Sequence, residues 1–172
     1  MLQERENAVT MKGNPVTLIG PEIRPEDEAP DFTVLMTDQS EHTLSDTKGK
    51  IRLIATVPSL DTPTCDQETR RFNEEASAFG SNVEVLTISA DLPFAQKRWC
   101  GAQDIDRVLT LSDHREMSFG KAYGTYIKEK RLECRAVFVV NADDIVTYVE
   151  YVPEMTHYPD YNAALEAVKA EL

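Results

Sequence analysis

The sequence predicts an α/β fold in which helices flank a mixed central sheet. Through the middle of the chain, short apolar runs alternate with segments whose apolar residues recur at helical spacing. The last part of the chain holds two apolar runs joined by a short polar turn, followed by an amphipathic segment. Alternating strands and helices favour parallel pairing and a hairpin is antiparallel, so the sheet should contain both kinds of pair.

The N-terminal part of the chain is predicted to form strands joined by exposed connections. Residues 1–14 are polar, and we expect them to be loosely held or to form a sheet edge. The next elements, in order, are a strand NPVTLIG (14–20), a surface loop PEIRPEDEAPDF (21–32), a strand FTVLMTD (32–38), an exposed connection TLSDTKGK (43–50) and a buried strand IRLIATV (51–57).

A helix is expected from Cys65 to Phe79, ending at Gly80. Thr64 followed by Gln67 has the spacing of a capping box, which places Cys65 at the first helical position. One face of this helix carries residues at helical spacing that should be buried, namely Cys65, Thr69, Phe72, Ala76 and Phe79.

The remaining elements complete the alternating order. They are a strand 83–90, a short helix 92–102 that begins at Pro93 and closes at Gly101, a strand 108–113, a short helix 116–124, two strands 135–141 and 145–152 joined as a hairpin, and a helix 159–172. The order β-β-β-α-β-α-β-α-β-β-α is compatible with a thioredoxin-like three-layer fold carrying an N-terminal β extension. A length of 172 residues suits one such domain over residues 1–172.

Composition excludes several classes of function. The net charge of −12 argues against nucleic acid and anionic membranes as partners, because both attract Lys and Arg. No apolar stretch approaches the roughly 20 residues of a membrane span. The N-terminal residues show neither the basic start nor the apolar core of a signal peptide.

Cysteine usage points to a reducing compartment, so we expect a cytoplasmic protein. The chain has three cysteines, Cys65, Cys100 and Cys134, which is a poor disulfide framework, and no C-x-x-C motif. The three histidines stand alone, without metal-ligand spacing to a cysteine. We therefore expect neither a metal nor a cofactor.

The stretch PSLDTPTCD (58–66) places Cys65 at a helix start, where the helix dipole favours the reactive thiolate. Asp61, Asp66 and Glu68 oppose this effect, but we expect them to be exposed and screened by solvent. A cation from elsewhere in the chain is then needed. Arg135, at the start of an apolar strand, is the candidate; a strand-end arginine that reaches solvent is the alternative. By composition alone, Cys65 could also be a small buried apolar residue.

The stretch PSLDTPTC carries the pattern PxxxTxxC, which resembles the active-site signature of the peroxiredoxins. The continuation TRRFNEEA and the segment ISADLPFAQKRWCG resemble one branch of that family, the bacterial thiol peroxidases, which are atypical two-cysteine peroxiredoxins. The resemblance extends over nearly the whole chain, from NPVTLIG to PDYNAAL.

The resemblance implies a thioredoxin-dependent peroxidase that acts on hydrogen peroxide and organic hydroperoxides. Cys65 would be the peroxidatic cysteine and form a sulfenic acid. Thr62 would hold the peroxide oxygen, Arg135 would stabilise the thiolate, and Pro58 would shield the pocket. Cys100 would resolve the sulfenic acid as an intramolecular disulfide, which a thioredoxin would reduce. The family also implies a homodimer, and unwinding around Cys65 and Trp99–Cys100 after oxidation.

Cys134 has no place in this scheme. If the strand already runs at Arg135, Cys134 points to the opposite face, and we interpret it as a packed thiol. Two other functions stay open for the cysteines. A peroxide-sensing switch or binding protein would be oxidised once and stall, whereas a disulfide reductase is disfavoured because C-x-x-C is missing.

Overall fold

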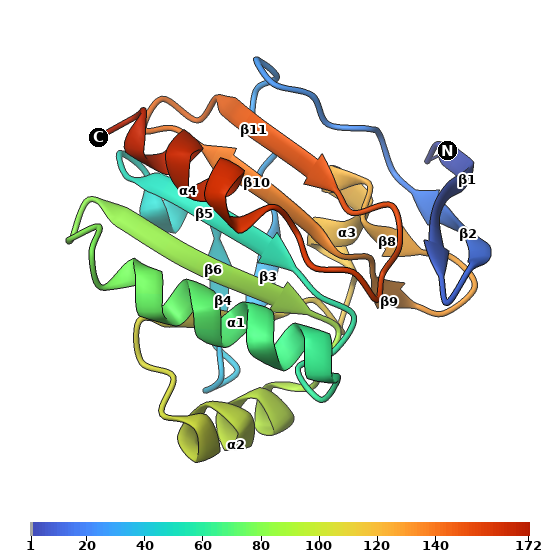
Figure 1. Cartoon of the computed structure of the whole chain (residues 1–172), viewed down its shortest axis with the longest axis horizontal. Helices are drawn as coiled ribbons and strands as arrows, with labels where there is room; N and C mark the ends of the chain where they lie inside the picture. Colours follow the sequence, from blue (N-terminus) through green and yellow to red (C-terminus); the bar gives the residue numbers. More distant parts are fainter. Residues whose placement is uncertain (1) are drawn as a thin grey trace.

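The computed structural model describes residues 2–172, which form two β-sheets and four α-helices (Figure 1). The larger sheet has the strand order β11-β10-β5-β6-β7-β3-β4. Its strands are β3 (Thr33–Leu35), β4 (Glu41–Thr43), β5 (Ile51–Thr56), β6 (Val83–Ser89), β7 (Val108–Ser112), β10 (Ala136–Val140) and β11 (Val146–Tyr151). Strands β5, β6 and β7 are parallel, and β10 is antiparallel to both β5 and β11, so the predicted mixed sheet is confirmed.

Helices cover both faces of this sheet. The helices are α1 (Pro63–Ala76), α2 (Pro93–Gln103), α3 (Ser118–Tyr123) and α4 (Tyr161–Lys169). Figure 1 shows α1 and α4 over one face, α2 beyond α1, and α3 behind the sheet. Among residues 2–172, no helix combines the length and the apolar content needed to cross a membrane.

The buried strands explain the three layers, because their side chains alternate between two apolar clusters. In β5, Leu53 and Ala55 pack with Phe72 of α1 and Leu165 of α4. Ile54, between them, packs on the other face with Phe119 and Tyr123 of α3. All residues of β5 and β10 are buried, as expected for strands covered on both faces. The predicted three-layer α/β fold is confirmed.

A second, smaller sheet lies beside α3 and has the order β1-β2-β8-β9. Its strands are β1 (Glu4–Met11), β2 (Asn14–Ile19), β8 (Tyr126–Ile127) and β9 (Leu132–Glu133). Residues 1–14 were expected either to be loosely held or to form a sheet edge, and β1 does form the edge of this sheet. Met1 lies outside the described residues. This sheet is the N-terminal β extension.

Several short elements were not predicted. Strands β4, β8 and β9 have two or three residues each, and a 3-10 helix occupies Leu44–Thr47 within the connection expected to be irregular. Such elements are too short to show a hydrophobic period in the sequence. They form because neighbouring chain segments supply hydrogen-bonding partners, which no local pattern records.

All four helices differ from the prediction by a few residues at their ends, and the differences in α1 and α2 lie near the predicted site residues. Helix α2 does not close at Gly101 but continues to Gln103, and Asp104 caps it in the left-handed conformation at φ 54°. Helix α1 begins at Pro63 and ends at Ala76, so Phe79, although buried, lies beyond the helix. The reason for the earlier start of α1 lies in Thr62.

Candidate active site

Thr62 is the N-cap of α1, and the predicted capping box at Thr64 is wrong. The Thr62 hydroxyl oxygen accepts a hydrogen bond from the Cys65 amide at 3.2 Å and donates to the Ser59 carbonyl at 3.2 Å. Pro63 then occupies the first helical position, which suits its fixed φ. Cys65 is therefore the third helical residue, in the first turn of α1, where the positive end of the helix dipole favours negative charge.

Arg135 lies directly against Cys65. Its Nη2 donates to the Cys65 Sγ at 3.2 Å, and its Nε donates to the Met155 carbonyl at 3.0 Å. The arginine is only 1% exposed, so the alternative of a strand-end arginine reaching solvent is excluded. The structure thus brings together the two residues, 70 positions apart in the sequence, that the charge argument paired.

Glu68 is the residue of this site that the sequence reasoning misplaced. It was expected to be exposed, like Asp61 and Asp66, but it is fully buried, with its Oε1 3.6 Å from the Arg135 Nη1. Asp61 is exposed and Asp66 is partly so. Helical spacing was the available signal, since Glu68 lies three residues after Cys65 and four before Phe72, on the buried face.

Burial decides the charge of Glu68. Desolvation raises its pKa to about 8, against the opposing effect of the Arg135 charge. Neither carboxyl oxygen has a hydrogen-bond partner among residues 2–172. The cost of removing a charged Glu68 from water is therefore not fully compensated by hydrogen bonds. The raised pKa favours the protonated form of Glu68, which neutralises less of the Arg135 charge beside the sulfur.

Replacing Glu68 with Gln should flatten the dependence of stability on pH. A carboxyl group whose pKa is raised on folding stabilises the folded state at pH values below its ordinary pKa, and this stabilisation is lost as pH rises through about 8. Thermal unfolding of the reduced protein between about pH 5 and pH 9 should therefore show a smaller fall in Tm for Glu68→Gln than for the wild type.

Glu75 of the same helix, which is only partly buried, provides the matched control, because Glu75→Gln should leave the wild-type pH slope in place. Glu133 is also buried, and desolvation raises its pKa, but it contributes equally to all three proteins. Parallel Tm curves for the wild type and Glu68→Gln would show that Glu68 is ionised in the folded protein.

The other two thiols have different surroundings. Cys100 of α2 is half-buried, with its Sγ 3.2 Å from the Thr110 Oγ1, and burial raises its pKa. Cys134 is fully buried in the cluster behind the sheet, away from Cys65, and burial raises its pKa as well. Among residues 2–172, Cys65 is the one cysteine whose sulfur accepts a hydrogen bond from a cation, and all three thiols are free.

Cys65 and Cys100 border the same small apolar cluster. Val57, Leu60, Cys65 and Trp99 form it, and Cys100 packs against it. Trp99 belongs to α2, yet its Nε1 donates to the Asp66 carboxylate of α1 at 3.0 Å. The two predicted redox cysteines thus lie on neighbouring helices whose contact is made by Trp99.

A cavity of about 540 Å³ opens beside Arg135. The predicted site residues Pro58, Thr62 and Arg135 line one side of it. The other walls come from the β1–β2 hairpin and from two loops, with Met11, Lys12, Asn14, Val16, Lys130, Met155 and Thr156. Pro63 and Thr64 complete the lining, whose accessible surface is mainly apolar although Lys12, Asn14, Lys130 and several threonines contribute polar groups besides Arg135.

Glu154 holds the β1–β2 hairpin over this cavity. Its carboxylate accepts hydrogen bonds from the Thr156 hydroxyl at 2.7 Å, the Gly13 amide at 2.7 Å, the Thr156 amide at 2.8 Å and the Thr10 hydroxyl at 2.8 Å. These bonds lower the pKa of Glu154. Since the neighbouring Met155 carbonyl holds Arg135, one loop fixes both the hairpin and the guanidinium.

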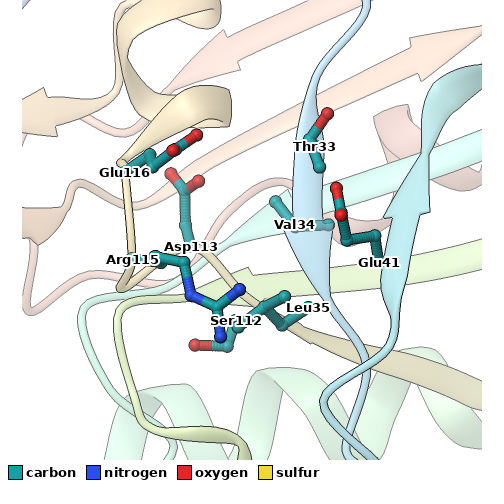
Figure 2. Close-up of a pocket in the computed structure, with 8 residues that line it drawn as sticks. All are labelled: Thr33, Val34, Leu35, Glu41, Ser112, Asp113, Arg115 and Glu116. Carbon is teal, nitrogen blue, oxygen red and sulfur yellow. The ribbon is translucent and has the colours of Figure 1, made fainter.

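A second, smaller cavity lies at another edge of the large sheet and contains none of the predicted site residues. It measures about 100 Å³ and lies between β3, β4 and the loop after β7 (Figure 2). Its lining is Thr33, Val34, Leu35, Glu41, Ser112, Asp113, Arg115 and Glu116. The cavity beside Arg135, in contrast, is lined by the predicted site residues Pro58, Thr62 and Arg135.

Comparison with known proteins agrees with the resemblance seen in the sequence. Residues 24–165 match the Redoxin family. A thiol peroxidase of Halalkalibacterium halodurans is 61% identical over 165 residues, covering 96% of this chain and 99% of that protein. A thiol peroxidase of Bacillus subtilis is 58% identical over 162 residues, covering 94% and 96%. The crystal structure of a peroxiredoxin-like protein from Aquifex aeolicus superposes with a TM-score of 0.90 at 40% identity, covering 99% of both chains.

Proposed function

Because this chain belongs to the Redoxin family, among the bacterial thiol peroxidases, we propose that it reduces hydroperoxides through a Cys65 sulfenic acid and a Cys65–Cys100 disulfide. A thioredoxin then reduces the disulfide. The observation that carries the proposal is the 3.2 Å contact between the Arg135 Nη2 and the Cys65 Sγ, at the wall of a cavity that Thr62 and Pro58 also line.

The first step is attack of the Cys65 thiolate on one peroxide oxygen. The S–O bond forms as the O–O bond breaks, and the departing oxygen takes a proton and leaves as water or an alcohol. Arg135 favours the thiolate and stabilises the charge that develops on the oxygens. A protonated Glu68 keeps this positive charge from being neutralised.

Thr62 is suited to orient the peroxide. Its hydroxyl already donates to the Ser59 carbonyl and accepts from the Cys65 amide, which leaves one lone pair unused. That lone pair can accept a hydrogen bond from a peroxide O–H. Pro58 is buried at the same wall and restricts the approach of water.

The size and lining of the cavity support organic hydroperoxides as substrates in addition to hydrogen peroxide. A volume of about 540 Å³ exceeds what a molecule with two heavy atoms requires. Met11, Val16 and Met155 offer apolar surface to an alkyl group, while the polar groups at Thr62 and Arg135 receive the peroxide end.

The second step joins the two cysteines. The Cys100 sulfur attacks the Cys65 sulfenic acid, so that an S–S bond forms, the S–O bond breaks and the oxygen leaves as water with the thiol proton. A thioredoxin dithiol then exchanges with this disulfide and is itself oxidised. We infer from the family a cytoplasmic homodimer in which each chain is one domain.

Mass spectrometry of the peroxide-treated protein tests this scheme. Digestion without reductant should give one linked peptide pair, containing Cys65 and Cys100, and thioredoxin should abolish it. Continuous peroxide consumption with thioredoxin and its reductase should accompany this pair. A link to Cys134, or oxidation that stops after one equivalent of peroxide, would contradict the scheme; the second result is that expected of a peroxide sensor.

A further inference from the structure

A group of polar side chains between α1 and α2 fastens the helix that carries Cys100 to the helix that carries Cys65. We name Asp66, Arg70, Trp99 and Gln103 the α1–α2 latch. The Asp66 Oδ1 accepts from the Trp99 Nε1 at 3.0 Å, and its Oδ2 accepts from the Arg70 Nε at 2.9 Å. Arg70 in turn donates to the Gln103 side chain. One carboxylate of α1 thus holds α2 both directly and through Arg70.

The position of Asp66 in α1 connects the latch to the reacting cysteine. Asp66 follows Cys65 directly, and its amide donates to the Thr62 carbonyl at 2.9 Å, which is a hydrogen bond of the first turn. If this turn unwinds, the carboxylate of Asp66 is displaced and its bond to Trp99 is broken. Conversely, α2 cannot leave its place without removing Trp99 from Asp66.

Trp99 also packs in the apolar cluster that both cysteines border. The residue is 8% exposed and packs with Val57, Leu60 and Cys65, and Cys100 lies against this same cluster. The Cys100 sulfur meanwhile contacts Thr110 of β7. Movement of Cys100 toward Cys65 therefore breaks its contact with Thr110 and disturbs the packing of the cluster around Trp99.

From these contacts we propose that Asp66 is a positioning residue whose bond to Trp99 makes the release of α2 depend on unwinding of the first turn of α1. The inference rests on the proposed Cys65–Cys100 disulfide. The latch then sets the balance between two fates of the sulfenic acid. Slow release leaves time for a second peroxide to oxidise Cys65 to the sulfinic acid, and fast release favours the disulfide and loss of water.

Two substitutions approach the same bond from opposite sides. Asp66→Ala removes the acceptor, whereas Trp99→Phe removes the donor and leaves α1 unchanged. After oxidation by hydrogen peroxide in quenched flow, each variant should form the Cys65–Cys100 disulfide about three- to tenfold faster than the wild type, which lies within the range expected for the net contribution of one ordinary hydrogen bond in a protein. The sulfinic acid fraction at high peroxide should fall in parallel.

The double variant decides whether the effect passes through this bond. Asp66→Ala combined with Trp99→Phe should form the disulfide no faster than the faster single variant, because both remove one interaction. Glu75→Ala is the control, since Glu75 is also an α1 carboxylate in an i,i+4 pair with an arginine, and its pair lies away from α2. It should match the wild type.

The two proposals fail in different ways. Absence of a Cys65–Cys100 disulfide in the wild type would overturn the proposed function. If the wild type forms the disulfide and the single variants form it at an unchanged or lower rate, the inference about the latch is wrong while the function stands. The inference would also be overturned if the rate increase in the double variant equalled the product of the increases in the two single variants, because the two substitutions would then act independently.

Discussion

Cys65→Ser should abolish peroxidase turnover. A serine hydroxyl is not ionised at neutral pH and does not form a sulfenic acid, so neither the nucleophile nor its oxidised intermediate is available. The loss in kcat should be on the order of 10⁴-fold or more, the scale observed when an enzyme loses its nucleophile. The fold should persist, because the serine oxygen can still accept the hydrogen bond that Arg135 donates to the sulfur.

Peroxide consumption coupled to thioredoxin measures this loss, and Cys134→Ala is the matched control. Cys134 is buried in the opposite cluster and contributes to packing, so its replacement should reduce stability rather than turnover. Substantial thioredoxin-coupled activity in Cys65→Ser would remove Cys65 from the role of nucleophile.

Cys100→Ser should convert the enzyme from many turnovers to one equivalent of peroxide per chain. The Cys65 sulfenic acid would form normally but find no thiol with which to condense. A serine hydroxyl can keep the contact with Thr110, so that α2 should remain docked. The trapped sulfenic acid would then oxidise further to the sulfinic acid as the peroxide concentration rises.

A sulfenic-acid-specific reagent followed by mass spectrometry distinguishes this state. The reagent should label Cys65 in peroxide-treated Cys100→Ser and label the wild type only weakly, because the disulfide competes. Should Cys100→Ser turn over with thioredoxin at the wild-type rate, Cys100 would not be the resolving cysteine, and Cys134 would be the next candidate.

The sequence predicted the core of the fold because the signals there are local and strong. Strand β10 is a continuous apolar run and β5 and β6 are rich in apolar and β-branched residues, a composition for which burial on both faces is the usual reason. The alternation of these runs with helical segments then leaves few arrangements, and a three-layer sheet is one of them. Elements of two or three residues carried no comparable signal.

The start of α1 shows where a local rule gave the wrong cap. The capping-box spacing to Gln67 pointed to Thr64, whereas the cap is Thr62. The deciding factor was Pro63, which lacks an amide proton and fits best at the first helical position. Attention to that proline would have placed the cap at Thr62.

One part of the candidate site, the cation beside Cys65, could be predicted because a reactive thiolate needs a positive charge nearby. A thiolate at Cys65 required a cation, and Arg135 was the residue least easily explained otherwise, so the pair could be anticipated. Glu68 was missed because a glutamate in a charged helix is usually solvated. Glu68 is buried because the face of α1 that carries it packs against the sheet. Apart from its helical spacing to Cys65 and Phe72, nothing in the neighbouring sequence indicates this packing.

The β1–β2 hairpin, held by Glu154, separates two properties of the protein into different parts of the chain. Cys65 lies in α1 and Arg135 lies directly before β10, whereas Met11, Lys12, Asn14 and Val16 of the hairpin form the far wall of the cavity. Insertions and exchanges in an edge hairpin are tolerated far better than changes in a buried strand. Substitutions in the hairpin can therefore alter the shape and lining of the cavity while the contact between Cys65 and Arg135 stays in place.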